Sequence, residues 1–399
     1  MRVSTAGASL VALNAMAADQ AALQTTQSQL SSGLAVQTPA DNPTAYAHVL
    51  QIQQALAAST QYEANSNVAQ ARLSTSEQTL TSVTNVLQSI SQLAVEANNS
   101  SLGNSARQQL NTQITTDIQQ LVGLANTQDA NGEYLYSGNA TTTQPYSVAA
   151  SGAVAYGGDT QSRQVQIGPS QTVTESDPGT AVFGSIPNGN GTFVTGTHAT
   201  NTGSGVVDGG TVTNPAAWVP DSYQVQFTSP TTYNVVNSAS TVVASGTFSP
   251  GSTVQFNGAS VTISGQPATG DVFTVAPSGT EDVFTTLNKL VATIGQNVNG
   301  TGGGAAQLAS ALGASIQQLT TAINHISAVS ATVGARLQQI TSNSSSQGAL
   351  KVQLQTTLSQ TQSVDYAAAI SQMNLQYTAL QAAQQSYAKF AQLSLFNYL

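Results

Sequence analysis

Apolar side chains recur at alternating spacings of three and four residues at both ends of this chain. Near the N-terminus the repeat contains Leu13, Met16, Leu23, Leu30 and Leu34, and near the C-terminus it contains Ile370, Met373, Tyr377, Leu380 and Tyr387. Glutamines occupy further positions of the same repeat. Such spacing lines one side of an α-helix with apolar groups, which then need a partner helix. The repeat therefore predicts that the first and last helices pair as a coiled coil.

Helical patterns continue inward from both ends. The spacing predicts a first helix from near Ser9 past Ala17, a second over about 45–99 and a third over about 105–126. Gly33, Pro39 and Pro43 interrupt the pattern after the first helix. In the C-terminal part, apolar stripes begin near Phe284 and again near Ile316. The polar run 342–346 is interpreted as a break before the last helix.

The middle of the chain has the composition of a β region. From about residue 132 to residue 277 it is rich in Gly, Pro, Thr and Val, and short alternating segments predict strands at 164–167, 223–227, 253–256 and 260–263. Asn257-Gly258 predicts a type I′ turn between the last two. No structure is assigned to 187–219, which is too rich in Gly, Thr and Asn.

These patterns predict an α+β multidomain fold, with the N- and C-terminal helices paired into a coiled-coil and helical-bundle rod and an all-β domain inserted at the tip. The expected terminal coiled-coil domain comprises 1–44 and 347–399. The expected helical rod domain comprises 45–186 and 278–346, with a flanking β segment at 132–186. The expected inserted β domain comprises 187–277.

Charged residues are unusually scarce. Eight Lys and Arg and seventeen Asp and Glu make up 6% of the chain and give a net charge of −9, against about 25% charged residues in typical proteins. So few basic residues argue against a nucleic-acid partner and against an anionic membrane surface. The absence of cysteine excludes disulfides and thiol chemistry. We also expect no transmembrane helix and no cleaved signal peptide.

No catalytic, cofactor-binding or metal-binding constellation is expected. His48, His198 and His325 are far apart in sequence, and His325 is interpreted as an ordinary helix-surface or boundary histidine. The segment 129–133 is interpreted as a tight turn, because its glycine is misplaced for a calcium loop. The glycine-rich run 300–304 follows a helix and lacks the ending of a phosphate loop, so it is interpreted as a connection.

The terminal helices are instead the expected functional surface. Their apolar stripes are too sparse to offset the entropy of ordering two long helices, so we expect the ends to be loose in a monomer and ordered in an assembly. Phe390, Phe396 and Leu399 add large apolar groups at the end of the chain. The expected assembly interface therefore comprises the ten residues of the repeat named above together with Phe390, Phe396 and Leu399.

Several motifs resemble the flagellin superfamily, and within it the family of hook–filament junction proteins. The resemblance rests on the opening residues 1–5 and on four further segments: Gln29-Leu30-Ser31-Ser32-Gly33, Pro39-Ala40-Asp41-Asn42-Pro43, the run 124–138, and Ser394-Leu395-Phe396-Asn397-Tyr398-Leu399. It covers nearly the whole chain except about 185–220. Ala40 and Asn42 soften the acidic turn that is usual in the family.

The resemblance implies a non-enzymatic, extracellular component of the flagellum. Its implied partners are other copies of the chain in a junction ring, the hook-associated protein FlgK, flagellin, and an export chaperone of the FlgN type. The implied route out of the cell is the flagellar type III export channel. Two alternatives remain open: a flagellin filament subunit, against which 39–43 and 394–399 argue, and a secreted adhesin or hydrolase that uses the β region.

Overall fold

The computed structural model describes residues 5–296 and 302–392, and the chain divides into two compact units, 1–64 with 342–399 and 65–341. The helices are α1 (Thr5–Ser32), α2 (Pro43–Ala97), α3 (Asn104–Ala125), α4 (Gly179–Val182), α5 (Val283–Ile294), α6 (Gly302–Gln362) and α7 (Tyr366–Gln392). The second and third helices confirm the sequence prediction to within two residues. The first begins earlier than expected, at Thr5.

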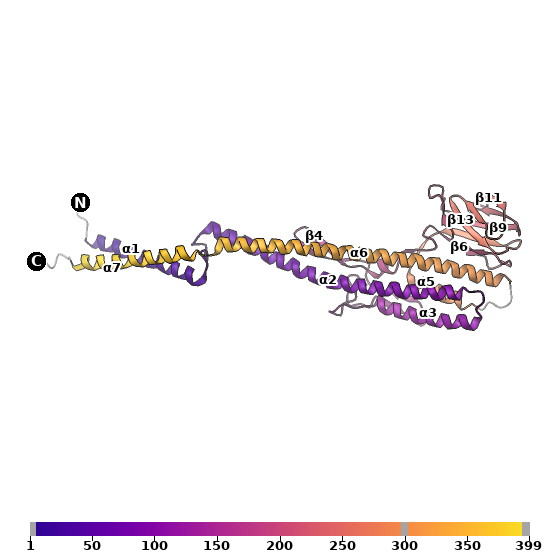
Figure 1. Ribbon diagram of the computed structural model, residues 1–399, viewed down its shortest axis with the longest axis horizontal. Coiled ribbons are helices and arrows are strands. Elements are labelled where there is room, and N and C mark those ends of the chain that lie inside the picture. Colours follow the sequence, from indigo (N-terminus) through magenta and orange to yellow (C-terminus); the bar gives the residue numbers. More distant parts are fainter. Residues whose placement is uncertain (1–4, 297–301, 393–399) are drawn as a thin grey trace. The chain divides into compact units, whose positions relative to one another are not determined.

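In the first unit, α1 and α7 lie side by side and run in opposite directions (Figure 1). The pairing of the first helix with the last is therefore confirmed. Both are rich in Ala, Leu and Gln, which have high helix propensity. The parts of α2 and α6 that belong to this unit are also joined, because Ser59 Oγ donates to Gln347 Oε1 at 3.3 Å and Lys351 Nζ lies 2.7 Å from Glu63 Oε2.

The expected break at 342–346 is wrong, because α6 continues through this polar run to Gln362. Ser and Asn cost only about 0.5 kcal/mol each in a helix relative to Ala, and Ser346 Oγ bonds back to the oxygen of Ser342. The break lies at 363–365 instead. There Asp365 Oδ1 accepts hydrogen bonds from the N–H groups of Ala367 and Ala368, which caps α7.

In the second unit, residues of α2, α3, α5 and α6 enclose one hydrophobic core. Leu80, Leu87, Ile114, Leu287 and Leu319 are completely buried in it. The apolar stripes that the sequence shows on these helices therefore face one another. Figure 1 shows the four helices alongside one another in this unit.

Fifteen strands lie in the described part of the chain. Their bounds are β1 (Tyr146–Val148), β2 (Val154–Tyr156), β3 (Arg163–Gly168), β4 (Gln171–Ser176), β5 (Ile186–Pro187), β6 (Phe193–Thr197), β7 (Val206–Val207), β8 (Thr211–Val212), β9 (Tyr223–Ser229), β10 (Thr232–Val236), β11 (Val242–Thr247), β12 (Thr253–Phe256), β13 (Ala259–Ser264), β14 (Val272–Pro277) and β15 (Thr280–Glu281). The four strands predicted from sequence are confirmed as β3, β9, β12 and β13. The pairs β1–β2, β3–β4 and β5–β15 form small two-stranded sheets.

The remaining strands form an antiparallel β region with a second core of its own. One sheet has the order β11-β10-β9-β14-β6, and the other has the order β12-β13-β7, with β8 also paired to β13. Phe193, Tyr223, Phe227 and Phe273 lie in this core. Asn257 and Gly258 both have positive φ and connect the pair Phe256–Ala259, so the predicted type I′ turn is confirmed.

The segment 187–219, to which the sequence assigned no structure, contains β6, β7 and β8. Apolar and polar residues alternate only weakly in this segment. Nevertheless, β6 pairs with β14 over five residue pairs from Phe193–Pro277 to Thr197–Phe273. Strand formation here depends on a distant partner, which the local sequence does not reveal. The division into three domains stays a prediction. The two compact units divide the chain at residues 64 and 341.

Candidate assembly surface and its polar joints

The facing sides of α1 and α7 are built from medium and small side chains. Met16, Leu23 and Leu30 of α1 and Met373, Leu380 and Tyr387 of α7 are partly buried, as is Leu34 just after α1. Thr26 is 4% exposed, and its Oγ1 donates a hydrogen bond to Gln376 Oε1 at 3.0 Å. Ala369 of α7 is 7% exposed. Ala12, Asp19 and Ala383 are also partly buried.

Three of the ten residues of the predicted repeat do not face the contact between α1 and α7. The side chains of Leu13, Ile370 and Tyr377 are 47%, 47% and 55% exposed. The residues one position earlier, Ala12, Ala369 and Gln376, are more buried and face the partner helix instead. Small side chains allow the two helices to approach on that side, so the larger ones are left outside.

This arrangement leaves four large apolar side chains uncovered. We call Leu10, Leu13, Ile370 and Tyr377 the outer apolar set; each is at least 47% exposed. Large exposed apolar groups on paired helices are typical of surfaces that bind another protein. The role of the predicted interface residues in assembly stays a prediction. The side chain of Phe390, and all of Phe396 and Leu399, lie outside the described residues.

The two linkers beside this helix pair are bonded to each other. Ala35 N donates to Gln362 O at 2.7 Å and Val364 N donates to Gly33 O at 2.9 Å, which pairs Leu34 with Ser363. Gly33 has a φ of +73°, and a Cβ there would lie 2.9 Å from the hydroxyl oxygen of Tyr366. Glycine is therefore required both by the backbone conformation and by the close approach.

The turn before α2 is fixed by Asp41. Its Oδ2 accepts hydrogen bonds from the N–H groups of Gln37 and Thr38, at 3.0 and 2.8 Å, and from the hydroxyl of Thr38. The backbone hydrogen bonds of Thr38 and Gln37 lower the pKa of the Asp41 carboxyl. Pro43 then begins α2 at a position where a missing N–H costs no helical bond.

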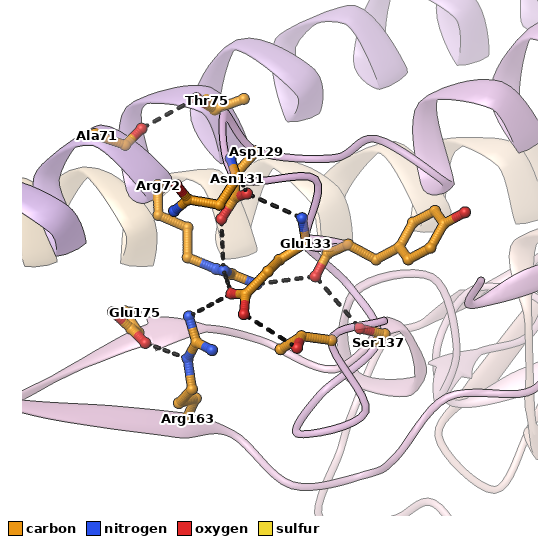
Figure 2. Close-up of polar contacts among 11 residues, drawn as sticks. Ala71, Arg72, Thr75, Asp129, Asn131, Glu133, Ser137, Arg163 and Glu175 are labelled. Atoms are coloured by element: carbon orange, nitrogen blue, oxygen red, sulfur yellow. Dashed lines mark hydrogen bonds and ion pairs between the residues drawn. The ribbon is translucent and has the colours of Figure 1, made fainter. Parts of the chain in front are cut away.

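A network of ion pairs attaches the segment after α3 to α2 (Figure 2). Arg72 of α2 is 3% exposed, and its Nη1 lies 2.8 Å from both Asp129 Oδ2 and Glu133 Oε2. Its Nη2 donates to Tyr134 O at 2.8 Å. Arg163 of β3 continues the network, with its Nη2 3.0 Å from Glu133 Oε2 and its Nε bonded to Glu175 of β4.

The predicted tight turn at 129–133 is confirmed, and it positions these carboxylates. Asp129 Oδ1 accepts from the N–H groups of Asn131 and Glu133, and Asp129 N donates to Glu133 O. Burial favours the neutral form of Glu133, but hydrogen bonds and charges from Arg163 and Arg72 outweigh it and lower the pKa. Sequence analysis missed this network, because its members are far apart in the sequence.

The described residues show no arrangement typical of an enzyme centre. No group of three or more His, Cys, Asp or Glu side chains in 5–296 and 302–392 is placed to hold a metal ion. His325 is partly buried, and its Nε2 lies 2.9 Å from the oxygen of Ala181, as expected of an ordinary histidine at the boundary of a helix surface. None of the helices in the described ranges combines the length and apolarity that crossing a membrane requires.

Comparison with known proteins gives consistent matches. Residues 3–141 match the bacterial flagellin N-terminal helical region, and residues 307–399 match the bacterial flagellin C-terminal helical region. The flagellar hook-associated protein 3 of Escherichia coli strain K12 is 33% identical over 158 residues. That alignment covers 40% of this chain and only 49% of the relative, so the chain matches about half the length of this curated relative.

Solved structures match over a longer part of the chain. The crystal structure of FlgL from Xanthomonas campestris is 33% identical, with a TM-score of 0.72, and the match covers 77% of this chain and 99% of that one. The flagellar junction protein FlgL from Legionella pneumophila is 30% identical, with a TM-score of 0.68, covering 74% of this chain and 99% of that one.

Proposed function

The chain belongs to the family of FlgL, the flagellar hook-associated protein 3, and from this membership we propose that it is a structural subunit of the hook–filament junction of a bacterial flagellum. The observation that carries the proposal is the similarity to FlgL along almost the entire length of the solved FlgL chains. The Legionella relative is a flagellar junction protein, which supports the position at the junction.

Self-association is proposed to use the paired terminal helices. The outer apolar set leaves Leu13, Ile370 and Tyr377 about half exposed in a single chain. Covering the exposed half of such a side chain against a neighbouring copy would contribute about half of the roughly 1.5–3 kcal/mol gained on full burial. The proposed assembly interface remains the ten residues of the terminal repeat together with Phe390, Phe396 and Leu399.

The proposed neighbours at the two sides of the junction are the hook-associated protein FlgK and flagellin. Before export, an FlgN-type chaperone is proposed to hold the C-terminal helix, and the chain is proposed to leave the cell through the flagellar type III channel. The absence of cysteine supports a route that requires an unfolded chain, because no cross-link can form on the way. FlgL is a structural family of the flagellum, and we propose no enzymatic role.

Deleting the gene in its own bacterium tests the function. The expected result is hooks without filaments, together with full-length flagellin shed into the medium, and restoration of filaments by the intact gene. Electron microscopy with a gold-labelled antibody should place the chain in one short band between hook and filament. A flagellin-gene deletion is the matched control, because it also leaves bare hooks but sheds no flagellin.

Two outcomes would contradict the proposal. Label along the whole filament, with loss of the shed protein in the deletion strain, would indicate a filament subunit. Normal filaments in the deletion strain would remove the chain from the axial structure and favour a secreted adhesin.

A further inference from the structure

A cavity of about 300 Å³ lies in the second unit between the turn that joins α2 to α3 and the first turns of α6. Leu308 and Leu312 of α6 form part of its apolar wall, and Asn98, Asn99 and Asn104 supply amide groups. Arg107 of α3 also lines it. The lining residues include no Asp or Glu, so the cavity combines one positive charge with neutral polar groups.

The guanidinium of Arg107 lacks a counterion. Arg107 is 8% exposed; its Nη2 donates to Asn104 Oδ1 at 2.7 Å, and its buried Nε has no hydrogen-bond partner. None of the ion pairs among the described residues includes Arg107. The segments 1–4, 297–301 and 393–399 contain no Asp or Glu in the sequence. No carboxylate side chain of this chain is therefore its partner.

The start of α3 adds a second source of positive potential at the same place. Gly103 is the N-cap residue, so no side chain caps the helix, and its first turn contains no acidic residue. The first intrahelical bond is donated by Arg107 N to Gly103 O, so the N–H groups of Ser105 and Ala106 precede it. The dipole of this 22-residue helix also favours an anion at its N-terminal end.

We propose that this cavity binds one oxyanion, a carboxylate or a phosphate group, between the guanidinium of Arg107 and the N-terminus of α3. A buried guanidinium without a counterion is costly, and an oxyanion in the cavity would supply the missing negative charge beside Arg107 and the first residues of α3. The site is independent of the assembly surface on α1 and α7. Its existence does not depend on the proposed junction role.

Titration calorimetry of the full chain tests the site, with inorganic phosphate and acetate as separate probes against chloride at matched ionic strength. We expect one saturable event per chain for at least one of the two anions. Amide chemical shifts of Ser105 and Ala106 should move with the same saturation curve. Binding of phosphate alone assigns a phosphate-type ligand, and binding of acetate assigns a carboxylate.

Arg107→Gln should weaken binding by about tenfold or more, because it removes a charge-assisted hydrogen bond. Lys351→Gln removes one positive charge in the other unit and should leave binding unchanged. Ala305→Trp, at the exposed rim of the cavity, blocks it without touching Arg107 and should also abolish binding. It serves as the test if Arg107→Gln does not fold.

Three results would overturn the proposal. One is the absence of saturable binding of both anions by the wild-type chain. Another is unchanged affinity in a folded Arg107→Gln variant. The third is unchanged affinity in Ala305→Trp, which would place the anion elsewhere on the chain.

Discussion

A buried guanidinium such as that of Arg72 is stabilised only while its carboxylate partners stay in place. Asp129 and Glu133 reach it from a single tight turn, whose geometry Asp129 sets through two backbone hydrogen bonds. Removing one member of such a buried group leaves the remaining charges without a partner of opposite sign. The network therefore fixes one arrangement of the 129–175 segment on α2.

Replacing Arg72 by Met should lower the free energy of unfolding by about 3 kcal/mol, the lower end of the range for breaking a buried ion pair, since Glu133 keeps Arg163 as a partner. Urea unfolding followed by circular dichroism measures the change. Lys351→Met is the control, because Lys351 and Glu63 form an exposed pair that should contribute less than about 1 kcal/mol. Equal small losses in both variants would contradict the structural role of Arg72.

Glu133 should make stability depend on pH in the acid range. Its pKa in the folded chain lies below the ordinary value of 4.5, so the unfolded chain binds the proton more tightly. The stabilisation is therefore complete above the unfolded pKa and is lost as pH falls through the lower folded pKa. The difference in urea midpoint between wild type and Glu133→Gln should be constant at neutral pH and shrink below about pH 4.5. A difference that stays constant down to pH 3 would disprove this assignment.

Residue-level prediction from sequence succeeded where the chemistry is local. The turns at Asn257-Gly258 and at 129–133 depend on residues next to one another, so their patterns were sufficient. The network of Arg72 and Arg163 was not predictable in the same way. Its members come from α2, a turn and a hairpin, and only tertiary packing brings them together.

At the scale of elements, the clearest difference between sequence and structure is the length of α6. A serine-rich run looks like a linker because these residues favour turns, but each costs a helix only a few tenths of a kcal/mol. The bonds of Gln347 and Lys351 to α2 hold α6 in place directly after this run. The true break at 363–365 had a usable signal in Asp365, an N-cap residue.

Substitution of Ser346 by proline distinguishes a helix from a linker at this place. We expect Ser346→Pro to cost about 3 kcal/mol or more, because proline removes a helical bond and clashes with the preceding turn. Ser346→Ala is the matched control and should be neutral or stabilising by up to about 0.5 kcal/mol. Thermal unfolding and helical ellipticity measure both variants. Unimpaired stability of the proline variant would show that the segment is not helical in solution.

The register of α1 against α7 leads to a prediction about assembly, which rests on the proposed function. Ile370→Ser lies in the outer apolar set, so the isolated chain should keep its unfolding free energy to within about 0.5 kcal/mol. The same variant should reduce incorporation into the flagellum, measured as the amount of chain in purified hook–filament preparations. Val242→Ser, on the exposed face of β11, is the control and should incorporate normally. Normal incorporation of Ile370→Ser would remove the outer apolar set from the interface.

At the scale of the whole molecule, the chain combines two hydrophobic cores that share no residue. One joins the helices of the second unit, and the other lies between the strands of the β region. The sequence predicted both kinds of structure from a sharp change in composition near residue 132. It could not predict how β6, β7 and β8 enter the sheets, because their partners β14 and β13 lie 47 or more residues further along the chain.

Deleting residues 189–278 should leave a folded helical protein. Pro187 pairs with Thr280, so the deletion joins Asn188 to Gly279 and creates an Asn-Gly turn of the type that closes a two-residue hairpin. Circular dichroism should show one cooperative thermal transition and a higher helical fraction. Gln318 and Ser310 of α6 lose their bonds to Gly189 and Val207, so some loss of stability is expected.

A second deletion, of residues 223–277, is the control because it leaves β6 to β8 without their sheet partners and should aggregate. If the 189–278 deletion also aggregates, the β region contributes to the folding of the helices. If it folds but does not restore motility to the deletion strain, the β region is needed in the flagellum.

From the proposed junction role we infer that the bonded linkers transmit a twisting force through the first unit. Gly33–Val36 and Gln362–Val364 run antiparallel and exchange hydrogen bonds, so a twisting force applied to α1 and α7 passes through two covalent strands loaded in parallel. Neither strand can rotate alone without breaking the bonds to the other. The hydroxyl of Tyr366 lies close to Gly33, where an added Cβ would be only 2.9 Å from it. A rotating shaft requires couplings with this property, since slack at any subunit would be multiplied along its length.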